Sequence, residues 1–128
     1  MSAMRASHAY VTRDSVSAAD DLDAPHPCRF ALPEGWSFAE LVELATRETR
    51  LPTILGGRAT WALSSNLPLA VVAQEWAEPA ALSRLESDRD ALELAGAELR
   101  LHWTYLAQLD PALVLETLRR LRLRAIPT

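Results

Sequence analysis

The chain has 128 residues, of which 49% are hydrophobic and 23% are charged, and its formal net charge is −4. This balance is typical of a single folded domain and excludes a disordered chain. The acidic charge argues against nucleic-acid binding, which requires a basic surface against the phosphates.

Several features indicate where the protein is found. Cys28 is the only cysteine, so no internal disulfide can form, and a reducing compartment is favoured. Residues Met1–His8 lack the apolar core of a secretory signal, and we expect them to be flexible. The apolar run Leu67–Ala73 is much shorter than the roughly 20 residues that span a bilayer. Together, these features predict a cytoplasmic protein without a membrane partner. Every lysine position is taken by arginine, as in GC-rich genomes, and we expect a bacterial source.

The first predicted elements are two strands separated by a long loop. Ala9–Thr12 is rich in β-branched and aromatic residues, which favours a strand. Cys28–Leu32 alternates apolar and polar residues, which predicts a second strand that pairs with the first in a wide hairpin. The loop between them, Asp14–Pro27, is acidic and longer than ordinary hairpin connections.

A helix is predicted after this hairpin. Ser37 and Glu40 have the spacing of a capping box, which marks a helix start. The helix should end near Arg50, because Pro52 disfavours helical geometry in the residue before it. One face of this helix is apolar and predicts core contacts through Phe38, Leu41, Val42 and Ala45.

The second half of the chain is predicted to contain three more strands and a final helix. Ala59–Leu63 and Leu69–Gln74 flank a polar turn and predict a hairpin. Pro79–Leu94 is interpreted as one or two helical turns that cross a sheet edge. Leu99–Tyr105 alternates apolar and polar residues and predicts a strand with one buried face. Asp110 and the proline after it predict the start of a helix with the apolar stripe Val114, Leu118 and Leu121.

This order of elements predicts one α+β domain over residues 1–128. We expect a five-stranded mixed or antiparallel sheet with the C-terminal helix packed on it. Over residues 9–106, the order resembles the β-grasp fold of ubiquitin-like proteins. That resemblance rests on element order and carries no functional motif.

Catalytic and cofactor sites receive little support from the sequence. His26 and Cys28 offer a base and a thiol, but no oxyanion-hole glycine accompanies them, so we interpret Cys28 as a core residue and His26 as a solvated loop residue. His102 lies on the polar face of its predicted strand without a recognisable partner. No phosphate-binding loop is present, since Gly56 and Gly57 form only a turn. We therefore assign no catalytic residue and no cofactor.

The acidic loop and one tryptophan are the predicted partner-binding residues. Asp20, Asp21 and Asp23 would form a negative patch suited to a basic protein surface. These aspartates and His26 could also bind a metal, but their spacing fits no metal-binding motif, and we assign none. Trp76 follows a predicted strand end, where tryptophan often contributes to binding.

The preferred hypothesis is a small, non-catalytic binding protein. Specifically, we expect an inhibitor or immunity-type protein that masks a basic surface or active site of a larger partner, such as a toxin. One alternative is a small enzyme that uses His26, His102 or Cys28. The other is an adaptor that binds its partner through a sheet edge.

Overall fold

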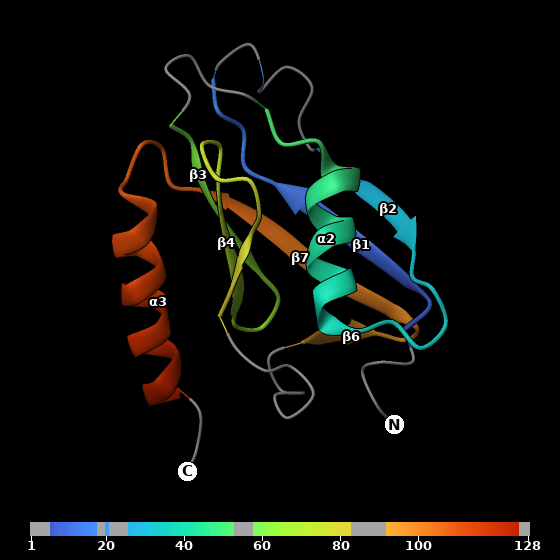
Figure 1. Ribbon diagram of the computed structural model, residues 1–128. Coiled ribbons are helices and arrows are strands. Elements are labelled where there is room, and N and C mark those ends of the chain that lie inside the picture. Colours follow the sequence, from blue (N-terminus) through green and yellow to red (C-terminus); the bar gives the residue numbers. More distant parts are fainter. Residues whose placement is uncertain (1–5, 18–19, 21–25, 53–57, 83–91, 126–128) are drawn as a thin grey trace.

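The computed structural model describes residues 6–17, 20, 26–52, 58–82 and 92–125, with side chains described up to residue 121. These residues form an α+β domain with one mixed, seven-stranded sheet and two helices (Figure 1). The strands follow the order β2-β1-β7-β3-β4-β5, and β6 pairs with β7 off this path. Within the described residues, no helix is long and apolar enough to cross a membrane.

The N-terminal hairpin is confirmed, and its first strand lies inside the sheet. β1 (His8–Arg13) pairs antiparallel with β2 (Cys28–Ala31). On its other side, β1 pairs in parallel with β7 (Glu98–Tyr105). This parallel pairing brings Thr12 opposite His102, although the two residues are far apart in the sequence.

The second hairpin is also confirmed. β3 (Thr60–Ser64) pairs antiparallel with β4 (Pro68–Ala73), and the register shifts beside Ser64. β3 also pairs antiparallel with β7, which makes β7 a central strand. Side chains that alternate along β7 meet the main core, and three of them are almost fully buried: Leu99, Leu101 and Trp103.

Helix α2 (Phe38–Thr49) has the predicted capping box and the predicted buried face. The Ser37 hydroxyl accepts from the Glu40 backbone N–H, and the Glu40 carboxylate accepts from the Ser37 N–H. The helix ends at Arg50, which adopts a left-handed conformation with φ 53°. Its inward side chains are those that the sequence predicted: Phe38, Leu41, Val42 and Ala45.

Helix α3 (Pro111–Ala125) begins after Asp110, as predicted, and its contacts are with β4. The residues Ala62, Val71 and Ala73 are buried but do not belong to the main core cluster. They alternate with the main-core residues along β3 and β4, so they face the opposite side of the sheet. We therefore assign α3 as the cover of this second face, away from α2 (Figure 1).

Two expectations require correction. The predicted helical turns of Pro79–Leu94 contain two short strands instead, β5 (Ala80–Ala81) and β6 (Glu93–Ala95), which pair with β4 and β7. Residues 83–91 lie outside the described residues. The sheet therefore has more than five strands. The expected flexibility of Met1–His8 stays a prediction, since residues 1–5 lie outside the described residues; Ala6 is buried, and its carbonyl accepts from Trp36 Nε1 at 3.1 Å.

Candidate functional site

Part of the sheet's second face is not covered by α3 and is polar. Its side chains alternate with the buried residues of β1 and β7. Tyr10 pairs in register with Arg100 and lies 5.8 Å from its guanidinium carbon, while Arg29 from β2 lies 5.0 Å from the same ring. The uncovered face therefore presents polar groups from three neighbouring strands.

A three-residue hydrogen-bonded chain lies at one end of this face. His102 Nε2 is 2.8 Å from Asp14 Oδ1, and His102 Nδ1 is 2.7 Å from Thr12 Oγ1. The other carboxylate oxygen of Asp14 accepts from the Tyr105 backbone N–H at 2.9 Å. Because an ionised carboxylate only accepts, the ring donates from Nε2, and Nδ1 can accept the Thr12 hydroxyl proton.

Two members of this Thr12–His102–Asp14 chain, Thr12 and His102, border a hollow of about 260 Å³. The side chain of His102 is 41% exposed, so a molecule in the hollow could reach it. The guanidinium of Arg100 supplies a positive charge in the same hollow, which is lined in all by Tyr10, Thr12, Ser64, Ser65, Glu93, Arg100, Leu101 and His102. A hydroxyl, a base and a carboxylate in series are the groups that activate a nucleophile in acyl transfer.

A second polar cluster fixes the start of the acidic loop. Arg13 binds both carboxylate oxygens of Asp20, at 2.7 and 2.9 Å, and also donates to His26 Nδ1 at 3.3 Å. Asp20 accepts in addition from the Val16 backbone N–H. The hydrogen bonds from Arg13, aided by this backbone bond, hold the pKa of Asp20 well below its usual range.

In the structure, Asp20 is hydrogen-bonded to Arg13. Its role in partner binding stays a prediction. Its side chain is only 17% exposed, so it does not form a free negative tip. His26 is also held in this cluster, with Nε2 3.1 Å from Ser15 Oγ, instead of being a solvated residue. Asp21 and Asp23, the other two predicted contacts, lie outside the described residues.

The three residues of the enzyme alternative have separate partners. His26 belongs to the Arg13 cluster and His102 to the Thr12 chain, while the Cys28 thiol donates to the Glu48 carbonyl at 3.4 Å. Burial, and secondarily the Glu48 charge, raises the pKa of Cys28, which reduces its thiolate fraction at neutral pH. Within the described residues, no group of three or more candidate ligands could hold a metal ion.

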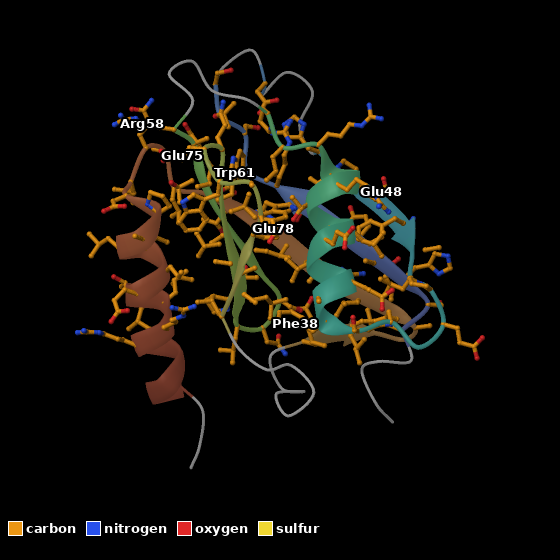
Figure 2. All side chains as sticks on the ribbon, in the orientation of Figure 1. Phe38, Glu48, Arg58, Trp61, Glu75 and Glu78 are labelled. Atoms are coloured by element: carbon orange, nitrogen blue, oxygen red, sulfur yellow. The ribbon has the colours of Figure 1, made fainter. Side chains whose placement is uncertain are left out.

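Four exposed carboxylates on α2 and on the connection from β4 to β5 form no ion pair within the described residues, and we call them the acidic surface: Glu43, Glu48, Glu75 and Glu78. They do not form one continuous patch, because Glu48 lies on the side of α2 toward Cys28 and Glu75 lies beside Arg58 (Figure 2). Glu43 and Glu78 line one hollow of about 550 Å³ between α2 and the connection from β4 to β5. The floor of the hollow is apolar through residues such as Val42 and Pro79, and Arg47 also lines it. Figure 2 shows Glu78 beside α2 and Glu48 near the end of this helix.

Trp76 lies in the same connection. Its backbone N–H donates to the Ala73 carbonyl at 2.9 Å, which forms a turn at the end of β4. The side chain is half-buried, so part of the ring remains accessible beside the exposed residues Glu75 and Ala77. This position agrees with the predicted strand end, and binding through Trp76 stays a prediction.

Sequence reasoning missed the partners of His102. Thr12 and Asp14 come from the other end of the chain, and they reach His102 because β1 and β7 are parallel neighbours. The only available signal was the alternation of both strands, which places Thr12 and His102 on polar faces without saying that these faces adjoin. The acidic surface was missed because its members belong to two separate elements.

Comparisons with protein-family models, curated proteins and solved structures find no match for this chain.

Proposed function

We propose that this protein is a small, non-catalytic binding protein that covers a basic surface or active site of a larger protein partner, as an inhibitor or immunity-type protein does. The observation that carries the proposal is the acidic surface. Glu43 and Glu78, which share one hollow, are exposed and form no ion pair within the described residues, so their charge is available to a partner, and Glu48 and Glu75 are exposed as well. Such a field steers a basic partner and speeds association.

The hollow beside this surface supplies the second requirement of a protein interface. Its apolar floor, with residues such as Val42 and Ala77, can bury the stem of a long basic side chain, while Glu43 and Glu78 accept its charged end. Trp76, half-buried in the adjoining connection, is the proposed aromatic anchor. In this proposal Asp21 and Asp23 extend the contact from the loop, and Asp20 holds the loop's base through Arg13.

The test begins with affinity capture from the native host and identification of the captured protein by mass spectrometry. Titration calorimetry with the isolated partner then measures the dissociation constant at low and high salt. The quadruple variant Glu43→Gln/Glu48→Gln/Glu75→Gln/Glu78→Gln should bind about tenfold more weakly, because four exposed charge pairs at a few tenths of a kcal/mol each amount to about 1.4 kcal/mol. Its binding should also depend less on salt.

The control is Glu34→Gln/Glu93→Gln, which removes two unpaired charges at exposed positions outside the acidic surface. It should bind about as tightly as the parent. Equal weakening by both variants would reduce the effect to net charge and contradict the proposed contact. Unchanged binding by the quadruple variant would contradict it as well.

A second candidate function is supported by the Thr12–His102–Asp14 chain. Here the protein is a small hydrolase in which Thr12 attacks an ester carbonyl, His102 accepts its proton and later protonates the leaving group, and Asp14 orients the ring. Arg100 would bind an anionic part of the substrate. The test is hydrolysis of p-nitrophenyl acetate. Activity that Thr12→Val abolishes and Thr12→Ser retains supports this function, and a rate equal to that in buffer excludes it for this ester.

The adaptor alternative has weaker support, because the strands at the two ends of the sheet, β2 and β5, have four and two residues. Such short strands offer a partner few backbone groups. For the fold itself, we propose a β-grasp-like core made of β1, β2, β3, β4 and β7, with β5, β6 and α3 added to it. The strand order β2-β1-β7-β3-β4 with α2 on one face supports this proposal.

A further inference from the structure

The hollow that Thr12 and His102 border carries opposite charges on its two sides. Its volume is about 260 Å³. Its floor is β7, and its sides come from β1 and, opposite, from the end of β3 with the start of β6. Drug-sized ligands occupy pockets of about 300 to 1,000 Å³, so this hollow suits a smaller molecule.

The positive charge lies toward β1. The guanidinium carbon of Arg100 lies 5.8 Å from the ring of Tyr10 in β1, and Arg100 Nη2 lies 3.9 Å from Glu98 Oε1. Glu98 is itself bound at 2.8 Å to Arg29 of β2, on the far side of β1, so these contacts draw Arg100 away from β6. A separation of 3.9 Å is too long for a hydrogen bond. The N–H groups of Arg100 can therefore still donate to a ligand.

The negative charge lies on the opposite side, at Glu93 of β6. Glu93 is paired in register with Arg100, and opposite charges at such positions commonly attract each other across the strands. Here the two side chains form no ion pair, although both belong to the described residues. The Glu93 backbone N–H donates to Ser65 Oγ at 2.6 Å, and the Ser65 hydroxyl donates to the Arg100 carbonyl at 2.7 Å. Glu93 is thus held beside β7 with an exposed, unpaired carboxylate.

The remaining polar groups decide where an anionic group can bind. With the His102 ring neutral, the Thr12 hydroxyl donates to Nδ1, and the Ser64 hydroxyl donates to the His102 carbonyl at 3.5 Å. The ring N–H of His102 is used as well, in the hydrogen-bonded chain. Among the described side chains that line the hollow, the unused donors are therefore the Arg100 guanidinium and the Tyr10 phenol. Both lie toward β1, so an anionic group binds there.

We propose that this hollow binds a small zwitterion, a molecule with one carboxylate and one ammonium group such as a free amino acid. The carboxylate binds Arg100 and Tyr10, and the ammonium group binds Glu93. A ligand with only a negative charge would be repelled by Glu93, and one with only a positive charge would be repelled by Arg100.

This binding site goes beyond the proposed function. It lies on the face of the sheet that α2 does not cover, so the acidic surface stays free for a protein partner (Figure 1). Binding of the zwitterion involves no reaction at Thr12. The binding experiment and the ester assay can therefore succeed or fail independently of each other.

The first test follows amide NMR chemical shifts while probes are added in low-salt buffer. Glycine, β-alanine and γ-aminobutyrate carry both charges at increasing separations, whereas acetate and methylammonium carry one each. At least one zwitterion should bind about fivefold more tightly than either single-charge probe, which is the gain from one further exposed charge pair. The shifts should be largest at Glu93, Arg100 and His102, which line the hollow.

The second test uses variants that remove one charge each. Glu93→Gln should weaken the best zwitterion about fivefold and should bind acetate more tightly than the parent does, because the repulsion is gone. Arg100→Gln should weaken the same zwitterion and bind methylammonium more tightly. The matched controls are Glu34→Gln and Arg119→Gln, at exposed positions outside the hollow, and they should bind like the parent.

Four results would each overturn the proposal. The first is that no zwitterion binds, and the second is that acetate or methylammonium binds as tightly as the best zwitterion. The third is that Glu93→Gln or Arg100→Gln binds every probe like the parent. The fourth is that the controls weaken the zwitterion equally, which would attribute the effect to net charge.

Discussion

The carboxylate of Asp14 joins two strands, and its removal should have a measurable cost in stability. It accepts from His102 Nε2 at 2.8 Å and from the Tyr105 backbone N–H at 2.9 Å. Asp14→Ala removes both bonds and leaves this N–H without its acceptor. A hydrogen bond to a charged group contributes about 1.5 to 3 kcal/mol. Since the Asp14 side chain is 41% exposed, we take roughly half of this for each bond and expect a loss of about 2 kcal/mol.

Asp14→Asn is the informative comparison. The amide oxygen can still accept from Tyr105, and the amide N–H can donate to His102 Nε2 if the ring proton moves to Nδ1. The Thr12 hydroxyl then accepts from Nδ1, so every partner remains satisfied. We expect this variant to lose less than about 1 kcal/mol, because the geometry persists while the charge is gone.

Urea unfolding followed by circular dichroism at neutral pH measures both variants. The free energy of unfolding should fall in the order parent, Asp14→Asn, Asp14→Ala, with the slope against urea unchanged. An ordinary surface substitution changes the free energy of unfolding by less than about 0.5 kcal/mol. If Asp14→Ala stays within this range, the Asp14 hydrogen bonds do not stabilise the fold, and the prediction is wrong.

Three further predictions concern single side chains. Folding lowers the pKa of Asp20, so its pair with Arg13 contributes fully above the unfolded pKa of about 3.9 and is lost as the pH falls toward the folded pKa. Asp20→Asn should be less stable than the parent at pH 6, and this difference should begin to shrink below about pH 4 and continue to shrink at lower pH. A gap that is constant in acid would contradict this. Ser37→Ala should cost about 1 kcal/mol in urea unfolding, because it removes the acceptor of the Glu40 N–H, and no loss would show that the cap is unimportant. The raised pKa of Cys28 should make its reaction with a thiol reagent slow at pH 7 and faster above about pH 9, and fast labelling of the folded protein at pH 7 would disagree.

Local patterns predicted the elements that depend on local chemistry. The capping box at Ser37 and the Asp110 cap fixed two helix starts, since each motif satisfies backbone groups within a few residues. The alternation of Leu99–Tyr105 predicted β7 and its buried side. β5 and β6, with two and three residues, are too short for any periodicity to reveal, so alanine and leucine content suggested helical turns instead.

The polar sites depended on which strands are neighbours, and this information is not local. Thr12 and His102 meet only because β1 pairs with β7, a choice made by the packing of the whole sheet. Asp20 was predicted as part of a uniform acidic patch because its type matches Asp21 and Asp23. Its bidentate bond with Arg13 distinguishes it from a freely available charge, and only the folded path of the loop shows that bond.

The parallel pairing of β1 with β7 also sets the order in which the chain can fold. β1 is made first and β7 almost last, yet Ala9 and Val11 in β1 are completely buried in a core that includes Leu99 and Trp103. Until β7 exists, β1 lacks one of its two strand partners and keeps an unpaired edge. Contacts over such long sequence separations slow folding and expose apolar edges in the meantime. A chain cut short before β7 would therefore keep its N-terminal strands as an open, aggregation-prone edge.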